Sequence, residues 1–122
     1  MVIRESAEDY LETILILNQR MSHVRSIDIA QELSFSKPSV SVAMKNLREN
    51  NYITVDGNGY INLTESGMEI ANKIYERHVF LTEWLSSIGV DKKIAAEDAC
   101  RIEHVISPES FSAIKKYIAE KY

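Results

Sequence analysis

The chain reads SKPSVSVAMKNLR from Ser36 to Arg48, and this stretch decides the fold that we expect for the first half of the protein. Four apolar residues recur at the i, i+3, i+4 and i+7 spacing of a helix with one buried face: Val40, Ala43, Met44 and Leu47. Ser36 supplies an N-cap, and Pro38 stands early in the first turn, where a helix tolerates it. The stretch therefore predicts a helix that begins directly after Ser36.

The opposite face of this helix carries small, polar or basic side chains: Lys37, Ser39, Ser41, Val42, Lys45 and Asn46. A shorter helix, Ile27 to Leu33, is predicted before it, with Ser26 or Asp28 as its cap. Two short helices joined by a tight turn are typical of a helix-turn-helix, whose second helix enters the DNA major groove. An ordinary helical hairpin is the alternative. Three basic residues around the small face favour DNA binding: Lys37, Lys45 and Arg48.

Two short alternating segments follow this pair of helices, at residues 52–55 and 60–63, joined by Asp56-Gly57-Asn58-Gly59. They predict a β-hairpin, which in this position is the wing of a winged helix-turn-helix. The tip has no Lys or Arg, so Asn58 or the backbone is expected to touch phosphate. The candidate DNA-binding residues are Ser36, Lys37, Pro38, Ser39, Ser41, Val42, Lys45, Arg48 and Asn58.

The net charge of −4 for 122 residues argues against nucleic-acid binding, but the charge is unevenly distributed. Basic residues prevail between Arg20 and Arg48, whereas acids gather near the N-terminus at Glu5, Glu8, Asp9 and Glu12. A single cysteine excludes an internal disulfide and fits a reducing cytoplasm. No apolar run approaches the ~18 residues of a membrane span, so we expect no membrane association.

The second half of the chain predicts three more helices and no strand. The first runs from about Ser66 to Ser87, with an apolar stripe of Ile70, Ile74, His78, Leu81, Leu85 and Ile88. The second covers roughly 92–106, with Ile94, Ala95, Ala99, Ile102 and Ile106 near one stripe. The last follows Pro108, with Phe111, Ile114, Tyr117 and Ile118 inward. We therefore expect a mainly α protein, with a DNA-binding domain at 1–64 and a helical domain at 65–122.

Cys100, Glu103 and His104 stand at i, i+3 and i+4, so a helix would place them on one face. A thiol, a carboxylate and an imidazole can converge on a divalent transition metal, although a solvated polar stripe is the alternative. Asp9 and Glu12 form a second candidate pair, or they merely complement a helix dipole. His78, taken alone on its apolar stripe, is more typical of a core residue than of a ligand.

The winged helix-turn-helix, Arg77-His78, Ile88-Gly89-Val90-Asp91 and the stretch Asp98-Ala99-Cys100-Arg101-Ile102-Glu103-His104 closely resemble the metal-dependent repressors of the diphtheria toxin repressor and manganese transport regulator family. The resemblance implies a cytoplasmic homodimer that binds a double-stranded palindromic operator when loaded with Fe(II) or Mn(II), to control metal homeostasis genes. It implies metal ligands at Asp9, Glu12, His78, Cys100, Glu103 and His104. Asp9 and Glu12 match the manganese-type branch, whereas Cys100 matches the iron-type branch.

This mixed ligand set predicts Fe(II) as the favoured co-repressor, because thiolate suits iron better than manganese, with Mn(II) as the alternative. Two other classes of protein remain open. One is a metal-independent winged-helix regulator whose acidic residues are only solvated surface. The other is a small enzyme with Cys100 activated by His104; it is disfavoured because no oxyanion donors or orienting third group accompany the pair, so we expect no enzyme.

Overall fold

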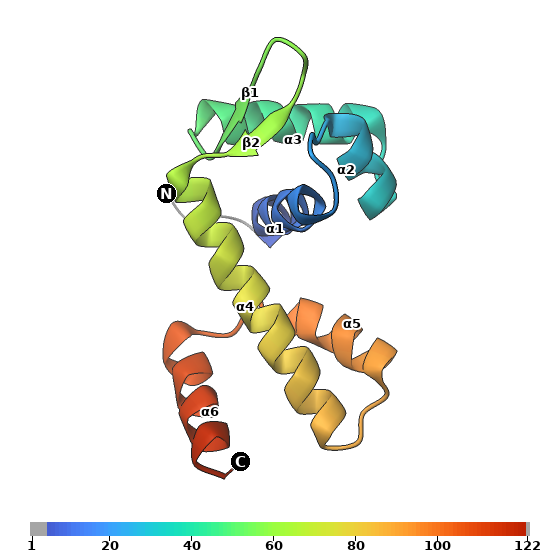
Figure 1. The fold of residues 1–122 in the computed structure, drawn as a ribbon. Helices are drawn as coiled ribbons and strands as arrows, with labels where there is room; N and C mark the ends of the chain where they lie inside the picture. The colour runs from blue at the N-terminus through green and yellow to red at the C-terminus, as the bar shows by residue number, and fades with distance from the viewer. Residues whose placement is uncertain (1–4, 122) are drawn as a thin grey trace. The chain divides into compact units, whose positions relative to one another are not determined.

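The computed structural model describes residues 5–121 and is mostly helical (Figure 1). The chain divides into two compact units, Met1–Lys73 and Ile74–Tyr122, which we call the N-terminal and C-terminal units. The division falls within one long helix, α4 (Glu65–Ser87). The expected mainly helical architecture with one small hairpin is confirmed for the described residues.

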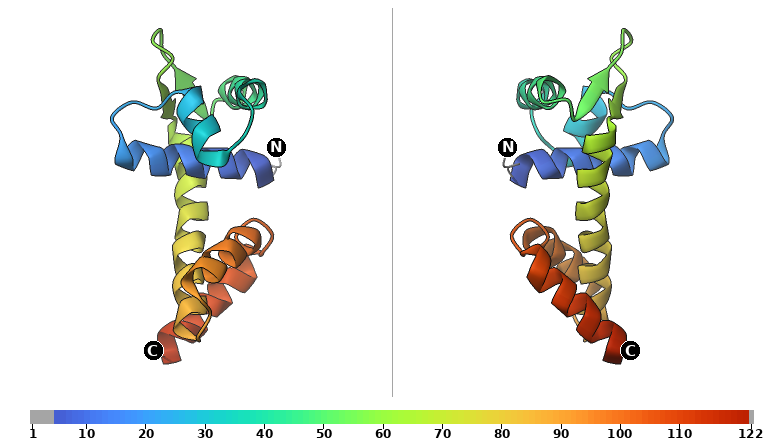
Figure 2. Two further views of the ribbon diagram at one scale, coloured as in Figure 1. Left: turned by 90° about the vertical axis from the view of Figure 1, so that its right-hand side faces the viewer. Right: turned by 90° about the vertical axis from the view of Figure 1, so that its left-hand side faces the viewer.

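The N-terminal unit is a winged helix-turn-helix made of α1 (Glu5–Arg20), α2 (Ser26–Leu33), α3 (Lys37–Glu49) and an antiparallel hairpin of β1 (Ile53–Val55) and β2 (Ile61–Leu63). α1 packs against α2, α3 and β2, and α3 also packs against β1. The fully buried side chains are aliphatic: Leu11, Ile14, Val24, Ile29, Val40, Ile53 and Ile61. The turned views show the loop of the hairpin projecting past α3 (Figure 2).

The start of α3 is as the sequence predicts, whereas the start of α2 is not. Ser36 is the N-cap of α3, and its Oγ accepts a hydrogen bond from the Ser39 amide at 3.3 Å. The N-cap of α2 is Arg25, with extended backbone, and neither Ser26 nor Asp28 occupies that position. Asp28 instead lies three residues into the turn and accepts the Arg25 amide at 2.9 Å, which is the second half of a capping box.

The first turn of α4 lies directly against the chain that enters β1. Thr64 caps the helix, because its Oγ1 accepts the Gly67 amide at 3.1 Å, and its own amide donates to Tyr52 O at 3.0 Å. A Cβ added at Gly67 would lie 2.0 Å from the same Tyr52 oxygen. Glycine is therefore required at position 67 by the close approach of another backbone segment.

The C-terminal unit consists of the second part of α4, α5 (Lys92–Ile102) and α6 (Pro108–Lys121). Asp91 caps α5 by accepting the Lys93 amide at 3.2 Å. The core is small: Leu81, Ala99 and Phe111 are buried together, and Phe80, Trp84, Ile102 and Ile106 pack against them. Leu81, Ala99 and Phe111 each come from a different helix, so this cluster holds the three helices together.

Several expectations for the C-terminal unit are wrong. The helix predicted over 92–106 ends at Ile102, and residues 103–105 form a turn. Three residues assigned to inward stripes are exposed: Ile88 at 55%, Ile94 at 51% and Tyr117 at 61%. The apolar stripes are longer than the core that they cover, so their ends reach solvent. No helix among residues 5–121 is long and apolar enough to cross a bilayer.

Candidate metal centre and nucleic-acid interface

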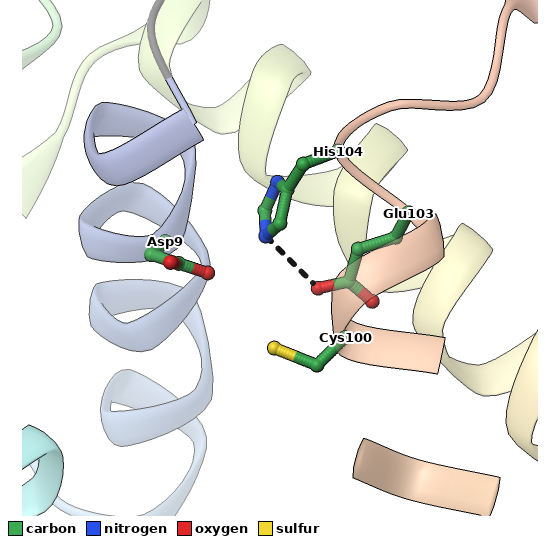
Figure 3. Close-up of side chains that lie close together, drawn as sticks. All are labelled: Asp9, Cys100, Glu103 and His104. Carbon is green, nitrogen blue, oxygen red and sulfur yellow. Dashed lines mark ion pairs between the residues drawn. The ribbon is translucent and has the colours of Figure 1, made fainter. Parts of the chain in front are cut away.

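Three of the candidate ligands gather where α5 ends (Figure 3). Cys100 lies in the last turn of α5, Glu103 is its C-cap with helical dihedral angles, and His104 follows in the turn. Each offers one donor atom, and these sulfur, oxygen and nitrogen atoms all lie within 4.8 Å of one another. Because Glu103 keeps helical dihedral angles, the predicted clustering holds although the helix itself stops at Ile102.

Glu103 is the centre of this group. Its side chain is 0% exposed, and its two carboxylate oxygens face two imidazoles. His78 Nδ1, from α4, lies 2.9 Å from Oε2, and His104 Nε2 lies 3.4 Å from Oε1. Within residues 5–121, Oε1 is buried and accepts no hydrogen bond. Burying an ionised carboxylate is costly unless positive charge compensates it, so this position calls for a cation or for protonated imidazoles.

The donor set fits a divalent transition metal. Carboxylate oxygen, imidazole nitrogen and cysteine sulfur are the three side-chain donor types used by such ions in proteins. His78, which the apolar stripe alone assigns to the core, is only partly buried, with 29% of its side chain exposed. Its ring points at a carboxylate rather than packing only on hydrocarbon, which is the arrangement that the family resemblance implies.

Arg77 is part of the stretch that carries the family resemblance, but the sequence assigned it no role. Its side chain is buried, with the residue 7% exposed, and Nη1 donates to Glu103 O at 3.0 Å and to Ile106 O at 3.1 Å. Its guanidinium carbon also lies 5.4 Å from the centre of the Phe111 ring. A signal was present in the sequence, because Arg77 lies three residues after Ile74 and four before Leu81, which is the register of the buried face.

The remaining candidate ligands, Asp9 and Glu12, lie on α1 in the N-terminal unit. Asp9 is half-buried and Glu12 is buried, so neither is an ordinary solvated acid. Between them stands Tyr10, whose hydroxyl pKa is raised by burial and, to a smaller extent, by the Asp9 carboxylate. The Tyr10 ring packs edge-on against Phe35 with 5.9 Å between centroids, directly before the cap of α3.

The candidate DNA-binding residues of α3 all lie on its exposed face: Ser36, Lys37, Pro38, Ser39, Ser41, Val42, Lys45 and Arg48. Val42 is 62% exposed, as expected for a residue that meets a partner. A shallow pocket of about 180 Å³ lies beside this face, lined by Ser26, Ser41, Met44, Lys45, Arg48 and Val55. Two hydroxyls and two cations around one hollow make a surface that suits a phosphate group.

The tip of the wing is closed by hydrogen bonds, and the Tyr60 ring at the end of this turn carries an aromatic and a basic neighbour. Asp56 Oδ1 accepts the amides of Asn58 at 2.8 Å and Tyr60 at 3.0 Å, so the tip is an ordered turn. The exposed His23 ring stacks on Tyr60 with 4.2 Å between centroids, and the Arg25 guanidinium lies 4.8 Å from the same ring. His23 lies in the exposed loop after α1, and the sequence did not predict this stack.

A winged helix-turn-helix in one unit and transition-metal donors gathered around a buried carboxylate in the other define a metal-responsive DNA-binding regulator. Two family models match the chain: the iron dependent repressor N-terminal DNA binding domain over residues 3–60, and the iron dependent repressor metal binding and dimerisation domain over 64–120. The chain belongs to the metal-dependent transcriptional repressors of the diphtheria toxin repressor and MntR family.

Individual relatives agree with this assignment. The HTH-type transcriptional regulator MJ0568 of Methanocaldococcus jannaschii is 34% identical over 123 residues, which cover 97% of this chain and 95% of that one. MntR of Listeria welshimeri is 34% identical over 109 residues, covering 89% of this chain and 77% of MntR. The solved structures of the manganese regulator SloR and of T. acidophilum IdeR each superpose with a TM-score of 0.82 at 26% identity, over 98% of this chain. Our chain spans about half the length of those two, 55% in each case.

Proposed function

We propose that this repressor uses a divalent metal, with Fe(II) favoured and Mn(II) as the alternative, as the co-repressor that controls metal homeostasis genes. The observation that carries the proposal is Glu103, a fully buried carboxylate with His78 Nδ1 at 2.9 Å and His104 Nε2 at 3.4 Å. A bound divalent cation would supply the positive charge that this carboxylate and a Cys100 thiolate need. No enzymatic activity forms part of the proposal.

The proposed ligand set has two parts. His78, Cys100, Glu103 and His104 belong to the C-terminal unit, where the donor atoms of Cys100, Glu103 and His104 lie within 4.8 Å of one another and His78 Nδ1 lies 2.9 Å from Glu103 Oε2. Asp9 and Glu12 on α1 complete the set, and their support is the match to the acidic positions of the manganese-type members. Acidic side chains gathered in a partly buried place repel one another or take up protons. We therefore expect a bound cation to stabilise the position of α1. This links the helix that packs on α2 and α3 to metal supply.

The DNA partner that we propose is a palindromic double-stranded operator, bound by a homodimer in the cytoplasm. Residues 1–64 would read the DNA and residues 65–122 would dimerise and bind metal. Two recognition helices must lie ~34 Å apart to meet successive major grooves. If the metal-loaded dimer favours that spacing and the other states do not, metal loading shifts the population toward the DNA-binding state. The exposed polar face of α3 supports this orientation of the protein on DNA.

Cys100 carries the preference for iron. Mn(II) is a hard ion that favours carboxylate and water, whereas Fe(II) stands one step higher in the affinity order and accepts thiolate and imidazole more readily. Asp9 and Glu12 supply oxygen donors that a manganese sensor uses, so Mn(II) remains competent as an activator. Zn(II) and Co(II) are expected to bind tightly in vitro whichever metal acts in the cell.

The test is operator binding titrated with Mn(II), and with Fe(II) under anaerobic conditions, on chelated protein. We expect binding to require metal and the wild type to respond at lower free Fe(II) than Mn(II). His104→Ala should lose the response, whereas Glu97→Gln, an exposed change on α5, should keep it. Cys100→Glu should shift activation toward Mn(II) without loss of DNA affinity at saturation.

Equal operator affinity with and without chelator would instead establish a metal-independent winged-helix regulator. A wild-type response at lower free Mn(II) than Fe(II) would overturn the iron preference and leave manganese as the co-repressor.

A further inference from the structure

We propose that Arg77 is the positioning residue of the metal centre. Its guanidinium holds the turn that presents Glu103 and His104, and it does so from α4, next to the third ligand His78. The inference rests on the proposed metal site and deepens it. It states that a residue that does not bind the metal sets the positions of the residues that do.

The hydrogen bonds of Arg77 bracket the ligands. One guanidinium nitrogen donates to Glu103 O at 3.0 Å and to Ile106 O at 3.1 Å, so the two carbonyls it engages enclose His104. The neighbouring residue on α4, His78, contacts the Glu103 side chain at 2.9 Å. Two adjacent residues of α4 therefore contact the turn at residues 103–106, which we call the ligand turn: one bonds to its backbone and the other to the Glu103 side chain.

Three backbone hydrogen bonds also shape this turn. Val105 N and Ile106 N both bond to Ile102 O at 3.0 Å, and the Glu103 amide closes the last helical turn on Ala99 O at 2.9 Å. No glycine stands between Glu103 and Pro108, so the usual left-handed glycine that ends a helix is absent from this segment of the sequence. The carbonyls at the C-terminal end of α5 carry partial negative charge, and the Arg77 cation is placed where that charge is unsatisfied.

A purely packing role does not explain this choice of residue. Arg77 is only 7% exposed, and burying a guanidinium is costly unless strong hydrogen bonds compensate it. An aliphatic residue would fill the same space against Phe111 without that cost. What arginine adds is a planar group of fixed shape, whose Nη1 alone meets both carbonyls while the plane lies near the Phe111 ring, whereas lysine offers a flexible point charge.

Lys115 provides a matched control within the same unit. Its ammonium lies 5.5 Å from the Phe111 ring, nearly as close as the 5.4 Å of Arg77, but its ion pair is with Glu76 and not with the ligand turn. Loss of Lys115 therefore removes a cation from the same aromatic ring and leaves the turn untouched. His104→Ala serves as the second control, because it removes a proposed ligand directly.

The experiment titrates chelated wild type, Arg77→Lys, Arg77→Gln, Lys115→Met and His104→Ala with Co(II). It records Co(II) affinity, the ligand-field bands with the thiolate-to-metal band of Cys100, and the melting temperature without metal. We expect both Arg77 variants to bind Co(II) about 10–100-fold more weakly, as for other outer-shell partners of metal ligands, with shifted bands. Lys115→Met should keep the wild-type affinity and spectrum.

Wild-type Co(II) affinity and bands in Arg77→Lys would overturn the inference, and so would a lowered melting temperature with an unchanged spectrum. Amide exchange gives a test that needs no variant: in metal-free wild type, Val105 and Ile106 should already be protected. Exchange at unprotected rates there would show that Arg77 does not hold the turn. Unaltered Co(II) binding by His104→Ala is a separate failure, because it refutes the proposed metal site itself.

Discussion

The two units of this protein differ in what they bury. The largest fully buried side chains of the N-terminal unit are all aliphatic, such as Leu11, Ile14 and Ile29. In the C-terminal unit the largest fully buried side chains are those of Ile74, Leu81 and Glu103, and the last of these is a carboxylate. Arg77, between Ile74 and Leu81 in the sequence, is only 7% exposed. The first unit is thus stabilised mainly by apolar burial. The second keeps part of its interior in ionisable groups, so its stability depends on what balances their charge.

This difference explains a division of roles. A close-packed, mainly aliphatic core supports the DNA-binding surface of the N-terminal unit. The C-terminal unit buries a carboxylate beside the buried His104 ring and the partly exposed His78 ring, so its stability depends on the charge around that carboxylate. The contrast is one of degree, because the N-terminal unit also buries one acid, Glu12, at 7% exposure, whereas Glu103 in the C-terminal unit is 0% exposed. The predictions below test that contrast, beginning with the largest expected effect.

Removing apolar volume from the N-terminal unit should lower its stability regardless of metal. Ile29→Ala removes a 0% exposed side chain, so unfolding should become easier by about 2–5 kcal/mol. Urea denaturation with and without Mn(II) measures it, and the loss should be similar in both. A loss seen only in chelated protein would mean that the aliphatic core and the metal centre are not independent.

Removing the charge of Glu103 should abolish the stabilisation by metal. Any ligand that binds only the folded state stabilises it, by about 2.7 kcal/mol at one hundred times its dissociation constant. We expect the wild type to gain this amount from Mn(II) and Glu103→Gln to gain almost none. Calorimetric melting with and without Mn(II) makes the comparison, and exposed Glu97→Gln is the control. A full gain in Glu103→Gln would remove Glu103 from the site.

On the reading unit, Lys45 should act through charge alone. As an exposed lysine on α3 beside the pocket lined by Ser41 and Arg48, it is placed to neutralise a phosphate. Lys45→Ala should weaken binding to all sequences and reduce the slope of log affinity against log salt by about one unit per contact. Binding measured across a salt series tests this, with Lys92→Ala on α5 as the control. An unchanged slope would place Lys45 away from the DNA backbone.

Ser39 should act through base identity, with the smallest effect. Its Oγ already accepts a hydrogen bond from Ser36 Oγ at 2.8 Å, which leaves its own hydroxyl proton to donate outward. Ser39→Ala should change which base pairs are preferred, by about 1 kcal/mol at a contacted position, and leave the salt slope as in wild type. Competition among operator variants measures it. If Ser39→Ala instead weakened every sequence equally, the groove face of α3 would be misassigned.

The same contrast governs what could be predicted from sequence. The N-terminal unit was predictable because its signals are local: Ser36 caps α3, Pro38 begins it, and the buried positions recur at helical spacing. The end of α5 was not, since the apolar spacing continues to Ile106 while the chain turns at Glu103. The hydrogen bonds of Arg77 to that turn span 26 and 29 residues, and no local pattern announces them.

The candidate site was predictable in composition more than in geometry. The spacing of Cys100, Glu103 and His104 indicated a shared location, and their donor atoms do lie together. His78 was assigned to the core when judged by its stripe alone, because periodicity reports burial and not the partner that a ring meets. The full burial of Glu103 was also not predicted, since the side chains that enclose it come from distant parts of the chain.

Gly67 has a consequence for how this sequence can evolve. A glycine inside a helix ordinarily costs about 1 kcal/mol relative to alanine, so drift normally replaces it without penalty. Here even the methyl group of alanine would lie 2.0 Å from the Tyr52 carbonyl oxygen. A backbone atom cannot move away as the end of a flexible side chain can. Every one-step change of the codon that alters the residue adds at least that methyl group. In a saturation-mutagenesis library, position 67 should therefore be among the least tolerant sites, although it is not one of the proposed DNA-binding or metal-binding residues.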